Sequence, residues 1–149
     1  MNDQRIETAR PPAFPGAGRL DLVRWIELPS HRDERGVLTA AESGSDLPFA
    51  LQRVYFIHDS VAERGGHAHR DTHQVVIAAS GRCEIRLSDG RDEQRFFLHD
   101  IRRGLYIVPM LFIRLCSFTP GSVLVSLAST HYDRTRSLRS WDQYLEAIR

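Results

Sequence analysis

The feature that most constrains the fold of this chain is a succession of short apolar and β-branched runs separated by turn residues. The runs recur roughly every eight to twelve residues, with Gly and Pro between them. Spacing of this kind is typical of an all-β sandwich or barrel. The predicted strands lie within Asp21–Leu28, Leu51–Ile57, His73–Ser80, Cys83–Leu87, Gln94–Leu98, Leu105–Val108, Phe112–Phe118 and Val123–Ala128.

Two local signals complete the predicted secondary structure. Ser88-Asp89-Gly90-Arg91 lies between two predicted strands and indicates a hairpin, because Asp-Gly tolerates positive φ. The end of the chain predicts one helix, capped by Ser137. Its apolar stripe recurs at helical spacing and is expected to serve packing. The stripe consists of Leu138, Trp141, Leu145 and Ile148.

The length of 149 residues and the mass of 17.0 kDa fit one domain. Residues 1–18 are rich in Pro and Gly and predict a flexible leader, which leaves residues 19–149 as a single domain. The chain has no apolar run of 18 residues and no apolar targeting segment at its start. With only Cys83 and Cys116, it is expected to be a reduced, cytoplasmic protein with two buried thiols.

The charge balance excludes several classes of partner and mechanism. Twenty basic residues against nineteen acidic ones give a net charge of +1, so nothing draws the whole chain to nucleic acid or to an anionic membrane. All twenty basic residues are Arg, which excludes a lysine nucleophile, a Schiff base and a Walker-A lysine. Arginine forks suit phosphate oxygens.

The most informative segment is Arg64-Gly-Gly-His-Ala-His-Arg-Asp-Thr-His-Gln74. One residue separates His67 from His69, so on a strand both side chains project from the same face. A pair of surface or core histidines would have the same spacing, and for the pair taken alone this alternative stays open.

The residues after the pair match the first motif of the cupin fold, with Gln74 at the acidic-or-amide position and Gly81 at the closing glycine. We therefore expect a cupin, a double-stranded β-helix or jelly-roll barrel with a short C-terminal helix. Metal-binding cupins have Glu at the position of Gln74 and another His in a second motif, near which this chain has Arg114. Because a transition metal needs three or four ligands, we expect no metal and no cofactor. The histidines that could still complete a metal site are His31, His58, His73 and His99.

Two imidazoles without a metal suit proton transfer, because their ordinary pKa lies near neutral pH. In one cavity they could remove and return protons on a carbon beside a carbonyl group. This chemistry indicates isomerisation or epimerisation rather than oxidation.

At this level of detail the chain resembles the cupin-type nucleotide-sugar 3,4-ketoisomerases (WxcM-like sugar ketoisomerases), which act on dTDP-4-keto-6-deoxyglucose. The resemblance extends from Asp33 to Tyr144, about three-quarters of the chain, and is sharpest between Arg64 and Gln74. The other matching pieces are Asp33–Gly36, Glu42, Pro48-Phe49, Arg53–Tyr55, Asp89-Gly90, Gly104–Tyr106, Pro109, Ser122–Leu124, Ala128-Ser129 and Tyr132-Asp133.

The resemblance implies a homodimeric, metal-free barrel that moves a ketone from carbon 4 to carbon 3 through an enediol. His67 or His69 would be the base and the other would assist it. Tyr55 would relay a proton or hold the enediolate oxygen, and Gln74 would orient an imidazole or bind the sugar. Four arginines become candidates for substrate binding: Arg35, Arg53, Arg64 and Arg114. Of these, Arg35 and Arg64 are the candidates for binding the diphosphate. A turn salt bridge for Arg35, a core position for Tyr55 and a solvated Arg64 are the structural alternatives.

Three departures from the family pattern leave the sugar, the stereochemistry at carbon 4 and the activity itself open. They are Phe112 in place of Trp, Arg114 in place of an acidic residue, and the segment Arg136–Trp141. The alternatives to an isomerase are a non-catalytic cupin that binds a sugar nucleotide and a metal-dependent cupin enzyme.

Overall fold

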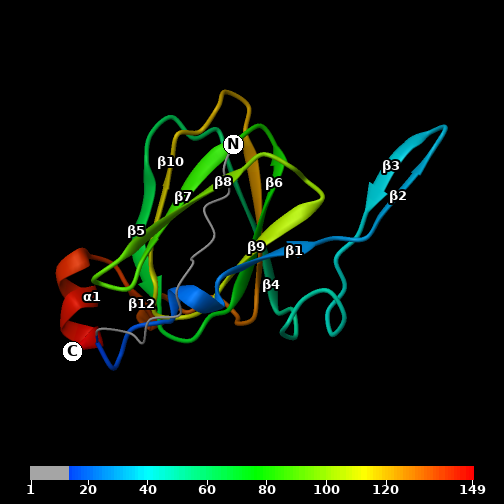
Figure 1. The fold of residues 1–149 in the computed structure, drawn as a ribbon. Coiled ribbons are helices and arrows are strands. Elements are labelled where there is room, and N and C mark those ends of the chain that lie inside the picture. Colours follow the sequence, from blue (N-terminus) through cyan, green and yellow to red (C-terminus); the bar gives the residue numbers. More distant parts are fainter. Residues whose placement is uncertain (1–13) are drawn as a thin grey trace.

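The chain folds into two five-stranded sheets that face each other (Figure 1). The structure is a computed structural model, and it describes residues 14–149. Pairing within both sheets is antiparallel. In spatial order, the first sheet contains β1 (Arg24–Glu27), β9 (Arg103–Ile107), β6 (Gln74–Ser80), β11 (Val123–Ala128) and β4 (Arg53–His58). The second contains β12 (Ser137–Leu138), β5 (Arg64–His69), β10 (Phe112–Cys116), β7 (Cys83–Ser88) and β8 (Glu93–Leu98). This architecture confirms the predicted all-β fold.

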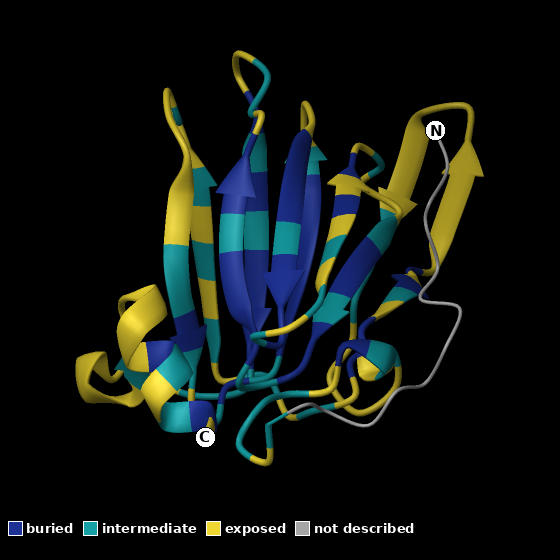
Figure 2. Cartoon of the chain, turned by 60° about the vertical axis from the view of Figure 1, so that its left-hand side comes forward, coloured by how far each residue is buried: buried dark blue, intermediate teal, exposed yellow. Residues whose placement is uncertain are grey.

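Apolar side chains from both sheets fill the space between them. Ile85 and Leu87 of β7 are fully buried, as are Leu105 of β9 and Leu124 of β11. Figure 2 shows this burial along the inner strands. Alternate residues of a strand face the same side, so each strand contributes every second residue to this core. Burying one such side chain stabilises the fold by about 1.5–3 kcal/mol.

The turn between β7 and β8 is the one predicted from the sequence. Gly90 has a φ of +94°, and the carboxylate of Asp89 accepts hydrogen bonds from the backbone amides of Arg91 and Asp92, at 2.9 and 2.7 Å. The predicted run at Asp21–Leu28 is divided: a 3₁₀ turn, η1 (Leu20–Leu22), precedes β1.

A two-stranded hairpin, β2 (Ser30–Asp33) and β3 (Gly36–Thr39), stands away from the sheets (Figure 1). Gly36 closes its turn with a φ of +138°, as the Asp-Glu-Arg-Gly sequence suggested. The strands themselves were not predicted, because their residues are exposed and show no inward-facing apolar alternation.

The C-terminal helix α1 (Trp141–Ile148) begins later than predicted. Ser137 and Leu138 form β12, which pairs with β5, so Ser137 is not the cap. Ser140 caps the helix instead, because its hydroxyl accepts a hydrogen bond from the Gln143 amide at 3.1 Å. The residues that α1 buries are Tyr144 and Ile148, whereas Leu145 is only half-buried.

The predicted leader covers residues 1–18, of which residues 1–13 lie outside the described part of the chain. Residues 14–18 contact the domain: the amide of Gly16 donates to the carbonyl of Ile148 at 2.9 Å, and that of Gly18 to Met110 at 2.7 Å. Cys83 and Cys116 are buried free thiols, as predicted. Within the described residues, no helix is long and apolar enough to cross a membrane.

Candidate active site

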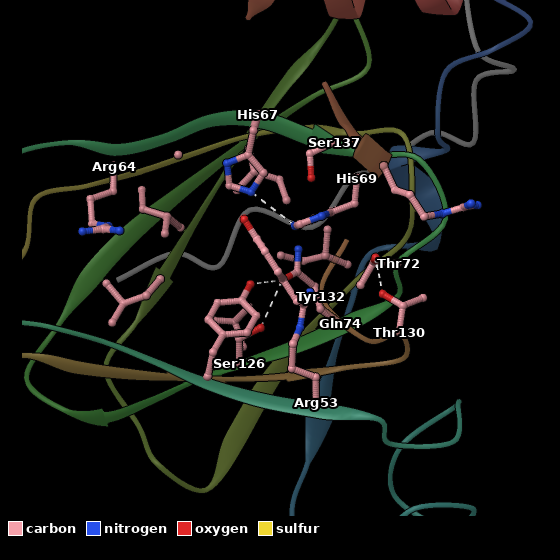
Figure 3. A pocket seen from close by; sticks show the side chains of 18 of the residues that line it. Arg53, Arg64, His67, His69, Thr72, Gln74, Ser126, Thr130, Tyr132 and Ser137 are labelled. Atoms are coloured by element: carbon pink, nitrogen blue, oxygen red, sulfur yellow. Dashed lines mark hydrogen bonds between the residues drawn. The ribbon is translucent and has the colours of Figure 1, made fainter. Parts of the chain in front are cut away.

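A cavity of about 740 Å³ opens between the two sheets, beside β5 (Figure 3). One wall carries polar side chains from β5, the facing wall carries polar side chains from β4, β6 and β11, and the interior is lined by apolar side chains of the barrel core. The apolar lining consists of Ile57, Val76, Ile107, Ile113 and Leu115.

His67 and His69 meet in this cavity because they alternate along β5. Their Nε2 atoms are 3.2 Å apart, and the two rings are nearly perpendicular at 81°. Ala68, between them, points to the other side and is fully buried against the helix side of the sheet. β10 and β12 pair with the two edges of β5, so the pair is held by the sheet rather than by a loop. The expected shared face is therefore present.

Burial keeps both imidazoles neutral. Desolvation lowers the pKa of His67, and the charges of Arg139 and Arg64 lower it further, against a hydrogen bond to the Gly65 backbone that raises it. Desolvation, the charge of His67 and then that of Arg53 lower the pKa of His69 to about 4. At neutral pH the pair is available as a base, and like charge between the rings disfavours a second proton.

Gln74 anchors a buried hydrogen-bond network on the opposite wall. Its Oε1 accepts hydrogen bonds from the Tyr55 hydroxyl at 2.9 Å and from the Ser126 hydroxyl at 3.1 Å. Gln74 is 3% exposed and Ser126 is 1% exposed. β6, β11 and β4 are neighbours in one sheet, so three inward-facing positions on adjacent strands create this cluster.

Arg53 lies at the His69 end of the cavity, between two tyrosine rings. Its guanidinium carbon is 5.3 Å from the ring centroid of Tyr55 and 5.6 Å from that of Tyr132. Its Nε is buried and has no hydrogen-bond partner within residues 14–149. A cation held by ring faces and lacking a carboxylate is suited to an anionic ligand.

Three further arginines line the cavity, and they differ in how they are paired. Arg136 forms an ion pair with Asp71. Arg64 and Arg139 form no ion pair with any residue of the described part, and both lie close enough to His67 to lower its pKa.

Arg35 and Arg114 do not line this cavity. Arg35 lies at the hairpin tip, its side chain 85% exposed and paired with Asp33 at 2.6 Å, which is the turn salt bridge considered above. Arg114 faces away from the barrel interior because Ile113 and Leu115 on either side of it face inward, and Glu93 binds it at 2.8 Å. The structure thus brings together the other predicted site residues, which are Arg53, Tyr55, Arg64, His67, His69 and Gln74.

Several cavity residues were not assigned to the site from the sequence, although some of them belong to segments that matched the family pattern or departed from it. Ser126 had a signal, since it is a polar residue inside the apolar run Val123–Ala128. Tyr132 and its neighbours follow β11 and are tied to the start of β6 by the Thr72–Thr130 hydrogen bond at 2.7 Å. The remaining polar residues of this group are His131, Asp133, Arg136, Ser137 and Arg139.

The histidines considered as further metal ligands lie elsewhere. His73 bonds to the Tyr106 hydroxyl at 2.8 Å, and His58 pairs with Asp59. Neither they nor His31 and His99 line the cavity. Within residues 14–149, no three His, Cys, Asp or Glu side chains converge as a metal site would require.

Comparison with known proteins places this site in a family. The family model described as "FdtA: WxcM-like, C-terminal" matches residues 21–149. The TDP-4-oxo-6-deoxy-α-D-glucose-3,4-oxoisomerase of Aneurinibacillus thermoaerophilus is 36% identical over 118 residues, which cover 78% of this chain and 85% of that one.

Two solved structures share both sequence and fold. The sugar 3,4-ketoisomerase QdtA of Thermoanaerobacterium thermosaccharolyticum, in complex with TDP, has 37% identity and a TM-score of 0.83, covering 87% of this chain and 96% of that one. The TDP-quinovose 3,4-ketoisomerase WlaRB of Campylobacter jejuni has 36% identity and a TM-score of 0.81, covering 85% and 99%. The chain is therefore an all-β cupin that belongs to the FdtA family of WxcM-like sugar ketoisomerases.

Proposed function

We propose that this chain is a nucleotide-sugar 3,4-ketoisomerase that moves the ketone of a dTDP-4-keto-6-deoxyhexose from carbon 4 to carbon 3. The observation that carries the proposal is the half-buried, neutral His67–His69 pair facing Gln74 and Tyr55 across one cavity. The relatives named above are 3,4-ketoisomerases of TDP-linked sugars, and the structure of a QdtA variant has been solved in complex with TDP-4-keto-6-deoxyglucose.

In this proposal the histidine pair moves one proton at a time. A neutral imidazole removes the proton from carbon 3, and the electron pair of that C–H bond forms a double bond to carbon 4. The oxygen on carbon 4 takes up a proton, which gives the enediol. The hydroxyl on carbon 3 then loses its proton while carbon 4 gains one, so the ketone forms at carbon 3. The net proton count is unchanged, and no oxidant or metal enters the balance.

Substrate orientation follows from the position of the charges. Arg64 and Arg139 flank His67 and are placed to meet the diphosphate, since an arginine fork can bind phosphate oxygens in a bidentate way. Arg53 lies beside His69 and Tyr55, where negative charge would develop on the sugar oxygens. Charge that develops in a cavity lined by apolar side chains is costly without such a cation.

We further propose that the protein acts as a cytoplasmic homodimer. β4 is the last strand of its sheet, and it exposes Val54 and Phe56, while the hairpin exposes Val37 and Leu38. A second copy of the chain covering these side chains would remove apolar surface from water. Arg35 lies far from the cavity of its own chain, so a contact between Arg35 and nucleotide requires the cavity of the partner.

The histidine pair provides the direct test. His69→Asn should abolish turnover and His67→Asn should reduce it severely, because proton transfer contributes roughly a hundred- to ten-thousandfold. His99→Asn, at an exposed position outside both the cavity and β4, is the matched control and should retain turnover. The measurement is NMR of the sugar ring after incubation of the 4-keto-6-deoxy nucleotide sugar in deuterated buffer.

The same assay separates the alternatives. Deuterium should appear at carbon 4 of the 3-keto product, and its rate of appearance should be the same with and without exhaustive EDTA treatment. Activity that EDTA removes and one metal ion restores would establish a metal-dependent cupin. Binding of the sugar nucleotide without any deuterium incorporation would establish a non-catalytic binding protein.

A further inference from the structure

We propose that Ser126, Gln74 and Tyr55 give the sugar site a fixed hydrogen-bond polarity, in which Gln74 donates to the carbonyl oxygen of the sugar and Tyr55 accepts from the neighbouring hydroxyl. Ser126 is a positioning residue that fixes this direction. The inference rests on the proposed function and specifies how the site distinguishes a 4-keto sugar from a 4-hydroxy sugar.

The polarity follows from counting donors and acceptors at Gln74. An amide oxygen has two lone pairs, and both are used here, by the hydroxyls of Tyr55 and Ser126. The amide nitrogen keeps two N–H donors, and Gln74 lines the cavity that faces the histidine pair. The group that Gln74 offers to a ligand is therefore a donor.

The same bonds determine what Tyr55 can offer. Its hydroxyl has one hydrogen, which is donated to Gln74, so only its lone pairs remain for a ligand. A sugar hydroxyl can donate to these lone pairs, whereas a carbonyl oxygen cannot. Gln74 and Tyr55 thus form an adjacent donor and acceptor, complementary to a ketone beside a hydroxyl.

Ser126 makes this arrangement directional. Without its hydroxyl, Oε1 of Gln74 would keep only the bond from Tyr55, and the amide could rotate at little cost. Ser126 is 1% exposed and lies on β11 between the strands of its two partners, so its hydroxyl is shielded from bulk solvent. The donor that faces the sugar also faces the oxygen on which charge develops during enediol formation.

Affinity ratios test the polarity without relying on turnover. The probes are the dTDP-4-keto-6-deoxy sugar, its 4-hydroxy counterpart and dTDP, titrated calorimetrically at low temperature in the presence of EDTA. Gln74→Glu replaces the donor with an acceptor of similar volume. It should weaken binding of the 4-keto sugar by about tenfold to a hundredfold, because two acceptors would then face each other. The 4-hydroxy sugar can donate to the carboxylate and should bind as well as before or better, and dTDP should be unaffected.

EDTA matters because Gln74→Glu places a carboxylate beside two histidines, which is a metal-binding combination. Gln52→Glu, at an exposed position outside the cavity, is the charge-matched control and should leave all three affinities unchanged. Ser126→Ala should shift the same ratio in the same direction by about three- to tenfold, and Ser126→Thr, which keeps the hydroxyl, should restore it.

An unchanged ratio of 4-keto to 4-hydroxy affinity in folded Gln74→Glu, or equal ratios in Ser126→Ala and the wild type, would overturn the proposal. If Gln74→Glu does not fold, the two Ser126 variants decide the question alone. A wild-type protein that shows this selectivity but incorporates no deuterium would retain the polarity and refute the isomerase, so the two failures are distinguishable.

Discussion

At the level of single residues, burial and the neighbouring charges determine the chemistry of the histidine pair, and the Asp71 carboxylate raises the pKa of His69 only against larger opposing effects. A buried imidazole beside a carboxylate is held in its charged form, whereas His67 and His69 are flanked by arginines and by each other. Both effects favour the neutral form. The two rings are in direct contact, so protonation of one imidazole affects the other and the two groups titrate as a coupled pair.

The pH dependence of the reaction follows from this environment. A base works only when unprotonated, so kcat/KM should persist as pH falls below 6.5 and disappear only as pH passes through the lowered pKa of the pair. Arg53→Met removes a charge that lowers the pKa of His69, so the acidic limb should move to higher pH, while Arg53→Lys should leave it in place. NMR titration of the imidazole signals in the free protein, alongside kcat/KM, provides the measurement. A wild-type limb at or above 6.5 would contradict this account.

The two cavity arginines without an ion pair in the described residues, Arg64 and Arg139, lead to a prediction about dTDP affinity. Arg64→Ala and Arg139→Ala should each raise the Kd for dTDP by about tenfold to a hundredfold, because each removes a hydrogen bond to a charged group. Arg82→Ala, at an exposed position outside the cavity, is the control and should bind dTDP normally. Calorimetric titration measures all three, and unchanged affinity in both cavity variants would assign the diphosphate to other residues.

At the level of elements, helix α1 is fixed beside β5 and β12 in part by one buried hydroxyl. Tyr144 is fully buried. Its hydroxyl can donate a hydrogen bond to the backbone carbonyl of Ser88, at 3.1 Å, or to that of Met110, at 2.9 Å. These carbonyls belong to segments far apart in the sequence, so the helix ties the end of β7 to the turn before β10. Burial raises the pKa of Tyr144, so the hydroxyl stays protonated at physiological pH.

Tyr144→Phe should therefore lower the free energy of unfolding by about 1–2 kcal/mol, since the ring still packs and only the hydrogen bonds are lost. Urea denaturation measures the change as a lower midpoint with an unchanged m-value. A midpoint equal to that of the wild type would show that water replaces the hydroxyl.

Elements with an inward face were predictable, and those without one were not. The barrel strands carry apolar residues either as buried runs, as in β6 and β7, or in alternation with more exposed residues, as in β4 and β8, and both patterns are visible in the sequence. β2 and β3 are instead exposed on both faces. The helix start was misplaced because Ser137 and Ser140 are equally good caps, and only the pairing of β12 with β5 decides between them.

The residues of the candidate site also fall into those that could be predicted from the sequence and those that could not. The His67–His69 pair was predictable because the two residues are two apart on one strand. The Ser126–Gln74 contact joins residues 52 positions apart, and Tyr132 reaches Arg53 only through the packing of the barrel. Contacts of this range leave no local pattern in a single sequence.

At the level of the whole molecule, the apolar surface of β4 and the hairpin predicts the assembly. Val54→Asp should convert the proposed homodimer into a monomer, because it places a charge in the proposed interface. Phe97→Asp, on the outer face of β8, is the matched control and should stay dimeric. Sedimentation equilibrium measures the mass, and a wild-type monomer would refute the assembly.

The same variant tests the position of Arg35. If the hairpin reaches the cavity of the partner, Arg35→Ala should weaken dTDP binding in the wild-type background and have no effect in the Val54→Asp monomer. Equal dissociation constants in the wild-type background would leave Arg35 in its turn salt bridge with Asp33.

The position of β5 between β10 and β12 also affects how the protein is made. Translation delivers β5 before both of its neighbours, so its two edges stay open while the rest of the domain is still being synthesised. Open strand edges invite pairing with the wrong partner. Gly65 and Gly66 have φ of +91° and +71° in the folded strand, and glycine weakens a strand as a template for pairing. We therefore expect this glycine pair to limit wrong pairing of β5 until β10 and β12 have been made.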